Sequence, residues 1–272
     1  MQTLSLFDEF PESMGEIADE RKHQKRLRLE PLIYDILKLK YLPRLCEAYD
    51  AYELPKNMDK CIVIVERRIH ENLLFLLRNI TYFAKGWSVC IVCSDVNMEY
   101  CKNIAGNNIN NIQFLPLFTG NPEPAVGKKE YNDLLKNADF YRKLNSENIL
   151  MIETDTYLRK PIPDIILSYD YVASPYSWDE NLSGGGISFR KRSSMIDICE
   201  KLTDKNYDQD IYICNGVRVL GYKMPEFMEG ITYFSESCLY EDPIGVHQWW
   251  TFFTKEMEDA EVIFDSLLTL EL

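Results

Sequence analysis

Short apolar runs alternate with amphipathic segments through the middle of this chain. The first run, residues 61–65, is a continuous stretch of Cys, Ile and Val, which is typical of a strand buried on both faces of a sheet. Similar runs at 88–93, 112–117 and 148–152 predict three more strands. Strands that alternate with helices predict right-handed β-α-β units and a mostly parallel sheet flanked by helices. The helices predicted between these strands span residues 73–83, 99–104, 131–136 and 138–144.

The N-terminal part of the chain has a different pattern. Residues 1–58 combine an acidic opening, a basic run from Arg21 to Arg28, and apolar residues at helical spacing up to Pro43. We expect an N-terminal helical extension followed by one main domain over residues 59–272. The extension could pack on the main domain, contact a partner or form a homodimer with a second copy. Its amphipathic pattern favours simple packing through one buried face.

Beyond Pro161 the alternation becomes less regular. The pattern predicts a strand at 187–190 and a helix at 193–202, separated from the earlier elements by a segment rich in Tyr and Trp and by a triple glycine. We interpret this part as an elaboration of the same sheet.

Composition and charge narrow the functional classes. The chain has 272 residues and 46% hydrophobic residues, enough for a sizeable core. Its 30 Lys and Arg face 43 Asp and Glu, a net charge of −13, which argues against general binding of nucleic acid or anionic lipid. No apolar run approaches the roughly 20 residues of a membrane-spanning helix, and the first ten residues do not resemble a secretory signal. With eight scattered cysteines, we expect a soluble cytoplasmic protein.

The most informative local motif is the pair Glu153 and Asp155, directly after the apolar run 148–152. Two carboxylates at this end of a parallel strand lie where open α/β sheets bind ligands. Hard oxygen donors suit Mg²⁺ or Mn²⁺ bridging a diphosphate, so the pair predicts a metal site for a nucleotide sugar. The alternative is that Glu153 ends the strand and Asp155 caps a turn.

Three other segments have polar groups in suggestive positions. Gly184 to Gly186 precede a predicted strand, which disfavours a phosphate loop and suggests a close approach by a ligand or another backbone. Asp208, Gln209 and Asp210 open a predicted helix, where they could contact sugar hydroxyls or simply cap the helix. His247 could complete a metal site, and Trp249 nearby could stack on a sugar face, although such groups are often structural.

Two further pairs end the first and second predicted strands. Glu66 with Arg67, and Ser94 with Asp95, fall at the edge where a nucleotide would lie. A carboxylate can accept from ribose hydroxyls and an arginine can offset diphosphate charge, whereas surface ion pairing is the structural alternative.

Taken in order, these motifs resemble an uncharacterised-domain family of glycosyltransferase-like proteins from bacteria, fungi and large DNA viruses. The resemblance covers about residues 61–250 and, more distantly, extends to the glycogenin and galactosyltransferase group of GT-A enzymes. The matching motifs are Val65-Glu66-Arg67, Arg78-Asn79, Gly86-Trp87, Tyr131-Asn132, Leu134-Leu135, Thr154-Asp155-Thr156, Tyr169 to Ala173 with Pro175, Gly185 to Arg190, Gln209 to Tyr212, and Gly245-Val246-His247 with Trp249.

The resemblance implies a GT-A-like fold, a divalent metal and a nucleoside diphosphate sugar donor, with UDP as the expected nucleotide. Asp155 and His247 would be metal ligands, with Glu153 as the further acidic candidate. Asp208 and Asp210 would act at the transferred sugar or the acceptor. Together with the pairs argued above from the strand ends, the further expected donor contacts are Glu66, Arg67, Ser94, Asp95, Asn132, Gly185, Gly186, Gln209 and Trp249.

We therefore expect a glycosyltransferase acting on an unidentified glycan, protein or lipid acceptor. Asp210 is the first candidate for the general base, since an inverting transfer needs a carboxylate to accept the acceptor's proton. A sugar nucleotidyltransferase is less well supported, because the segment after the first strand is not glycine-rich. A catalytically inactive sugar- or nucleotide-binding or scaffolding protein on the same fold is the non-enzymatic alternative.

Overall fold

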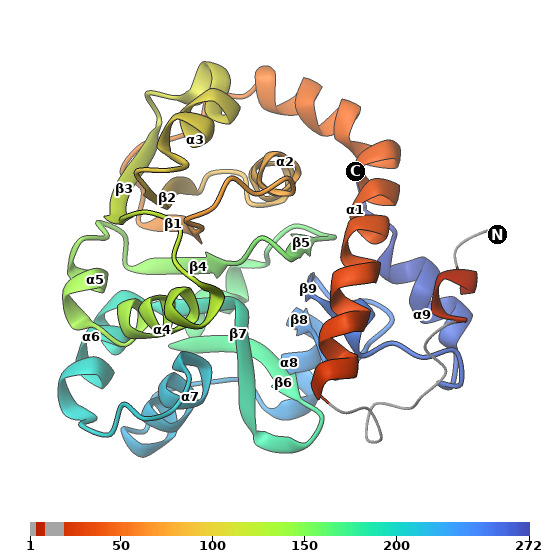
Figure 1. The fold of residues 1–272 in the computed structure, drawn as a ribbon. Helices are drawn as coiled ribbons and strands as arrows, with labels where there is room; N and C mark the ends of the chain where they lie inside the picture. Colours follow the sequence, from red (N-terminus) through yellow and green to blue (C-terminus); the bar gives the residue numbers. More distant parts are fainter. Residues whose placement is uncertain (1–3, 9–18) are drawn as a thin grey trace.

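A computed structural model describes residues 4–8 and 19–272 (Figure 1). Two parts of the predicted N-terminal extension, residues 1–3 and 9–18, lie outside the described residues. They include Glu9 of the acidic opening. The strands of the central sheet are β1 (Lys60–Val65), β2 (Ser88–Ser94), β3 (Ile112–Phe118), β4 (Asn148–Ile152), β6 (Tyr171–Tyr176) and β7 (Asp179–Lys191). Their order is β3-β2-β1-β4-β7-β6. Strands β1 to β4 are parallel, and β7 runs antiparallel to both of its neighbours, β4 and β6, so the predicted mostly parallel α/β sheet is confirmed.

Helices cover both faces of this sheet. Successive side chains of its buried strands point to opposite faces, so each buried strand contributes to two cores. In β1, Ile62 and Ile64 join the core beneath one group of helices, whereas Cys61 and Val63 join the core on the other face. The first group is α1 (Asp19–Asp50), α2 (Leu73–Phe83), α3 (Met98–Ala105) and α9 (Ala260–Leu267). The second group is α4 (Pro124–Leu135), α5 (Ala138–Arg142), α6 (Arg192–Lys201) and α7 (Gln209–Val219). Within the described residues, no helix is both long and apolar enough to cross a bilayer.

A second, three-stranded sheet lies beside the carboxyl end of β4. Its strands are β5 (Thr156–Leu158), β8 (Phe234–Ser235) and β9 (Gly245–His247), in the order β5-β9-β8. The remaining short elements are η1 (Leu4–Phe7), η3 (Gly106–Asn108), η4 (Asp164–Ser168), α8 (Phe227–Tyr233) and η5 (Trp249–Thr251). Through its pairing with β5, strand β9 from the C-terminal part of the chain lies beside the carboxyl end of β4.

Helix α1 is longer than the sequence pattern predicted. It continues through Pro43 to Asp50 and extends along one side of the molecule (Figure 1). A proline within a helix removes one backbone hydrogen bond. Here Leu45 and Tyr49, which follow the proline, are buried in the core, and this burial offsets the loss. The predicted packing of this helix on the rest of the chain through one face is confirmed.

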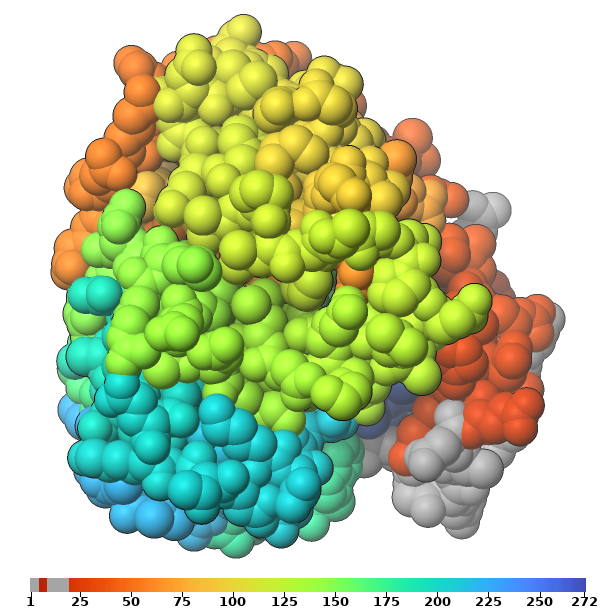
Figure 2. All heavy atoms as spheres, turned by 60° about the vertical axis from the view of Figure 1, so that its left-hand side comes forward, coloured from red at the N-terminus to blue at the C-terminus, as the bar shows by residue number. Residues whose placement is uncertain are grey.

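Strand β7 also begins earlier than predicted. The expected strand at 187–190 is the end of β7, so Gly184 to Gly186 lie inside the strand instead of before it. Glycines are poor strand formers and hide the alternating pattern, which explains the missed boundary. Figure 2 shows the segments from α3 to α7 forming one continuous surface, with α1 at its edge.

Candidate functional site

The carboxyl ends of the parallel strands form one edge of the central sheet, and acidic residues follow them. Glu66 comes directly after β1 and Glu153 directly after β4. The register pairs Ile64 with Ile152, so these two strand ends lie side by side. The backbone N–H of Glu153 also donates to the Gly186 carbonyl of β7, at 2.8 Å. Open α/β sheets bind ligands at this edge.

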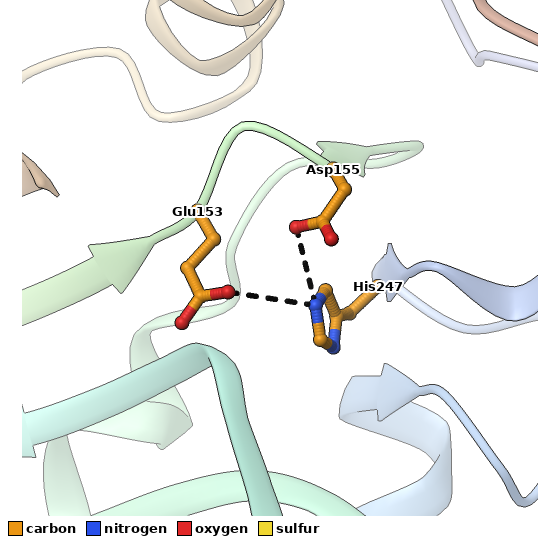
Figure 3. A group of neighbouring side chains, drawn as sticks. All are labelled: Glu153, Asp155 and His247. Atoms are coloured by element: carbon orange, nitrogen blue, oxygen red, sulfur yellow. Dashed lines mark ion pairs between the residues drawn. The ribbon is translucent and has the colours of Figure 1, made fainter. Parts of the chain in front are cut away.

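Glu153, Asp155 and His247 meet at this edge (Figure 3). His247 belongs to β9, whose pairing with β5 sets it opposite Thr156 and therefore beside Asp155. Its Nε2 lies 3.2 Å from Asp155 Oδ1 and 3.7 Å from Glu153 Oε2. Asp155 and His247 are buried, and Glu153 is partly buried. The three side chains thus point to one small volume although they come from distant parts of the chain.

The donor atoms of this group fit a divalent cation. One ligand atom from each residue lies within 4.8 Å of the others. An octahedral ion with bonds of about 2.1 Å separates neighbouring donors by about 3 Å, close to the spacing of the His247 and Asp155 atoms. Two carboxylates and one imidazole suit Mn²⁺ or Mg²⁺. The residues that sequence alone proposed as metal ligands are therefore brought together.

Glu236 orients the imidazole and was not predicted. Its Oε2 lies 3.2 Å from His247 Nδ1, and neither atom has another hydrogen-bond partner among the described residues. A proton held on Nδ1 by Glu236 directs Nε2 at Glu153 and Asp155, so that a metal ion bound there would replace the proton on Nε2, as in carboxylate–histidine–metal arrangements. Glu236 lies between two serines with no recognisable motif, so the sequence contains no local signal for this role.

Burial and mutual charge shift the pKa values of the three groups. Burial alone would lower the pKa of His247, but the carboxylates of Asp155 and Glu236 outweigh it and hold that pKa well above its usual value. Burial raises the pKa of Asp155, but His247 and Arg26 outweigh it, so the pKa falls below its ordinary range. Burial and the charge of Asp155 raise the pKa of Glu153. Perturbations of this kind are common at functional sites.

Helices α1 and α4 close over the acidic loop. Arg26 of α1 forms an ion pair with Asp155 Oδ2 at 2.5 Å, leaving Oδ1 facing His247. Tyr34 of the same helix donates to the carbonyls of Thr154 and Thr156, so α1 also fixes the loop backbone. On the other side, Tyr131 of α4 donates to Glu153 Oε1 at 2.5 Å.

Arg26 was missed because the basic run that contains it resembles a solvated helix face. The neighbouring Glu30 lies 3.7 Å from Arg26 and accepts from Asn72. Burial, followed by the charge of Asp155, raises the pKa of Glu30 to about 7. Arg26 and Glu30 therefore extend the charged network of the site into the N-terminal helix.

The three glycines of β7 make room for polar side chains. A Cβ at Gly184 would overlap Glu236, a Cβ at Gly185 would overlap Gln209, and a Cβ at Gly186 would overlap the ring of His247. The close approach expected from the sequence is therefore made by side chains of the chain itself. Only glycine lets the imidazole and its neighbours lie directly on the strand.

The segment Asp208 to Asp210 lies at the start of α7, where a helix was predicted. Asp208 is exposed and pairs with Lys128, whereas Asp210 accepts a hydrogen bond from Tyr176 OH. Gln209 is buried between them and accepts from Arg190 at 2.8 Å.

Asn132 of α4 supports this segment, because its Oδ1 accepts from the Gln209 backbone N–H at 2.5 Å. Asn132 and Gln209 therefore connect α4 to α7, and both side chains are buried. In this conformation they position the start of α7, next to Asp208 and Asp210.

The carboxyl edge also holds four of the predicted donor contacts, and their hydrogen bonds connect the loops of this edge. These residues are Glu66, Arg67, Ser94 and Asp95. Glu66 is buried and accepts from the backbone and the guanidinium of Arg68. Burial raises the pKa of Glu66, but the bonds and charge of Arg68 outweigh it and lower the pKa overall. Ser94 Oγ donates to the Arg67 carbonyl at 2.6 Å, and Asp95 accepts from the Gly120 N–H at 2.7 Å.

Arg67 reaches across to the loop after β3. Its guanidinium donates to the carbonyls of Thr119 and Gly120, pairs with Glu130 and lies 4.8 Å over the ring of Phe118. The side chain is mostly buried, so most of its donors are already used within the chain.

Trp249 differs from the other predicted donor contacts. Its ring is fully buried, its Nε1 donates to Tyr157 OH, and it packs against Phe7, Phe253 and Phe264. The structure places this side chain in the core, with no face open to a sugar, so we leave it out of the proposed donor site. Trp178 is the exposed tryptophan, at 58%.

In a comparison with known protein families, one family matches part of the chain. Residues 120–247 match a family described as a protein of unknown function (DUF5672). The matched segment is less than half of the chain; it includes Glu153, Asp155, Glu236 and His247 but not Arg26. No curated protein matches the chain.

Solved structures of similar fold include two kinds of transferase. The glycosyltransferase GlyE of Streptococcus pneumoniae TIGR4 is 11% identical with a TM-score of 0.46, and the match covers 78% of this chain and 61% of that one. A galactosyltransferase, LgtC, in complex with donor and acceptor sugar analogs, is 12% identical with a TM-score of 0.45, covering 78% and 96%. A cytidylyltransferase from Leptospira borgpetersenii serovar Hardjo-bovis is 13% identical with a TM-score of 0.40, covering 61% and 73%.

This chain thus spans about three fifths of the length of GlyE. Identities this low do not transfer activity or substrate from one protein to another, because one fold supports many functions.

Proposed function

We propose that this protein is a metal-dependent glycosyltransferase that uses a nucleoside diphosphate sugar, with UDP as the expected nucleotide. The observation that supports it most directly is the group of Glu153, Asp155 and His247 at the carboxyl edge of the sheet, with His247 Nε2 facing both carboxylates. Such an edge binds nucleotides in α/β proteins, and such a donor set suits Mn²⁺ or Mg²⁺.

When bound, the divalent ion would act as a Lewis acid that stabilises the negative charge developing on the leaving diphosphate. Asp155 and His247 would hold it, Glu153 would complete the protein ligands, and Glu236 would keep His247 in the tautomer that leaves Nε2 available.

In the proposed reaction a bond forms between the acceptor oxygen and the anomeric carbon, while the bond from that carbon to the diphosphate breaks. Asp210 would accept the proton of the acceptor hydroxyl if the transfer inverts configuration. Its carboxylate is partly exposed and already bound by Tyr176 OH, which fixes its orientation. Asp208 is the second carboxylate available at the transferred sugar.

The nucleotide would lie along the carboxyl edge beside the metal. Asp95 is exposed there and could accept hydrogen bonds from ribose hydroxyls. Glu66, Arg67 and Ser94 would hold the neighbouring loops in place through their hydrogen bonds. Gly185 and Gly186 would act indirectly, by letting Gln209 and His247 lie directly on β7, from where these side chains would contact the donor sugar and the metal. Asn132 would act by holding the Gln209 backbone.

The alternative is a binding protein that holds a nucleotide or sugar without transferring it. The ion pair of Arg26 with Asp155 favours it, because Arg26 already supplies a positive charge to this carboxylate. The two functions differ in turnover: a binding protein would bind the donor but would not cleave it, so no free nucleotide would form.

The proposal is tested by the thermal stability of the purified protein with nucleotides and nucleotide sugars, in Mn²⁺ and in EDTA. A ligand that binds only the folded state raises the melting temperature. We expect a shift with UDP or one UDP-sugar that requires Mn²⁺ and is lost in Asp155→Asn. The matched control is Asp265→Asn, an exposed aspartate of α9, which should keep the full shift. A folded wild-type protein that shows no metal-dependent shift with any nucleotide would refute the proposal.

A further inference from the structure

An exposed aromatic stack stands near the candidate site. Trp178 lies in the turn between β6 and β7 and is 58% exposed. Its ring stacks on Tyr176, with centroids 4.4 Å apart and planes at 19°, and Phe252 lies 6.2 Å from it. Large apolar side chains usually avoid solvent, so a tryptophan held flat at the surface by a second ring is a candidate binding surface.

Carboxylates lie close to the Tyr176 end of this stack. Tyr176 OH donates to Asp210, and Glu236 lies beside the Tyr176 ring over Gly184, while Asp179 and Glu180 open β7 directly after Trp178 in the sequence. Flat rings bordered by carboxylate oxygens match a pyranose, which presents an apolar face of C–H groups and a rim of hydroxyl donors. The negative charges oppose an anionic ligand such as the diphosphate of the donor.

The stack is continuous with the candidate metal ligands. A Cβ at Gly184 would touch both Tyr176 and Glu236, so these two side chains converge over the same residue of β7. Glu236 in turn lies 3.2 Å from His247. A chain of contacts therefore leads from the ring of Trp178 through Tyr176 and Glu236 to His247, one of the candidate metal ligands.

We propose that the Trp178–Tyr176 stack is the acceptor subsite and that the acceptor is a neutral saccharide. This inference rests on the proposed glycosyl transfer. The exposed part of the Trp178 ring packs against the apolar face of the acceptor sugar, and the neighbouring carboxylates, including Asp210, accept hydrogen bonds from its hydroxyls. The acceptor is thereby held beside the residue proposed to take its proton.

Tryptophan fluorescence tests saccharide binding directly. Trp87, Trp249 and Trp250 are buried, so a neutral quencher such as acrylamide acts mainly on Trp178. We expect at least one of lactose, maltotriose, cellotriose and N,N′-diacetylchitobiose to protect Trp178 from quenching, and Trp178→Phe to abolish the protected signal. The absence of protection by every saccharide, with or without UDP and Mn²⁺, would overturn the inference.

A second experiment separates acceptor binding from donor binding. UDP release from the donor is measured with water alone and with the protecting saccharide. Trp178→Leu keeps an apolar side chain but removes the ring, so we expect unchanged release in water and about tenfold lower saccharide-stimulated release. Trp178→Phe, which keeps a ring, should restore most of it. Leu39→Ala removes an exposed apolar side chain of α1 and should change neither rate.

The outcomes distinguish the two proposals. Lack of metal-dependent UDP binding by the wild type contradicts the proposed function, whereas the quenching experiment still decides whether Trp178 binds a saccharide. Normal UDP binding with full saccharide-stimulated release in Trp178→Leu contradicts the acceptor subsite. That result is also expected if the stack docks a protein.

Discussion

At the scale of single residues, the three glycines of β7 shape the candidate site as much as its charged side chains do. Glu236, Gln209 and His247 each lie over one glycine of β7. The imidazole is thereby fixed between Glu236 on one side and the two acidic candidate ligands on the other. Substitutions at these glycines should act on the site without removing any polar group.

Gly186→Ala tests this arrangement. Its Cβ would overlap the His247 ring, so we expect the imidazole to move, the free energy of unfolding to fall by about 1–3 kcal/mol, and Mn²⁺-dependent nucleotide stabilisation to be lost. The control is Gly127→Ala in α4, where the nearest atom to the new Cβ is 3.8 Å away and alanine favours the helix. Urea unfolding and thermal shifts measure both effects. A Gly186→Ala protein with unchanged metal response would show that His247 needs no such fixed position.

Glu30 gives a prediction of pH dependence. Its pKa is raised from 4.5 to about 7 by burial and by the charge of Asp155. The folded chain therefore binds this proton more tightly than the unfolded chain, so stability falls as the pH rises from about 4.5 to 7 and changes no further above that.

Replacing Glu30 with Gln should remove this decline. We expect Glu30→Gln to gain about 2 kcal/mol relative to the wild type between pH 5 and pH 7.5, measured by urea unfolding at several pH values. Glu47→Gln, at an exposed position of the same helix, should follow the wild-type curve. Parallel curves for wild type and Glu30→Gln would mean that Glu30 is ionised throughout this range.

At the scale of elements, the central strands could be predicted from sequence and the edges of the site could not. Strand β1 is a β-branched run buried on both faces, so local pattern and tertiary position agree. Asp155 and Glu153 were located for the same reason, because the end of a buried strand is visible in the sequence. Glu236 and Arg26 reach the site only through long-range pairing, β8 with β9 and α1 with the acidic loop, which no local pattern encodes.

The exposure of Trp249 and Trp178 could not be predicted from the sequence either. Both are tryptophans near polar residues in the sequence, yet one is fully buried and the other is 58% exposed. Burial of an aromatic side chain depends on which elements pack over it, and here Phe7 from the start of the chain and Phe264 from α9 cover Trp249. Choosing between the two rings therefore required the fold.

At the scale of the whole molecule, the N-terminal helix belongs to the same core as the sheet. Leu29, Ile33, Leu37 and Leu45 of α1 are buried in one cluster with residues of the sheet and of α9. Arg26 and Tyr34 of the same helix contact the acidic loop. We infer that α1 and residues 59–272 fold as one cooperative unit, even though the sequence pattern separates them.

A truncated chain of residues 59–272 tests this inference. Losing α1 would expose the apolar surface that four or more large side chains now cover, at roughly 1.5–3 kcal/mol for each, which is comparable to the whole stability of a typical domain. We therefore expect weak near-ultraviolet circular dichroism, a broad thermal transition and no metal-dependent nucleotide binding. Adding a peptide of residues 19–58 in trans should restore part of each signal, because the apolar face it must cover is still present. A truncated chain that unfolds sharply near the full-length melting temperature would instead make the helix a separable attachment, and Arg26 would then act on the site from outside the folding unit.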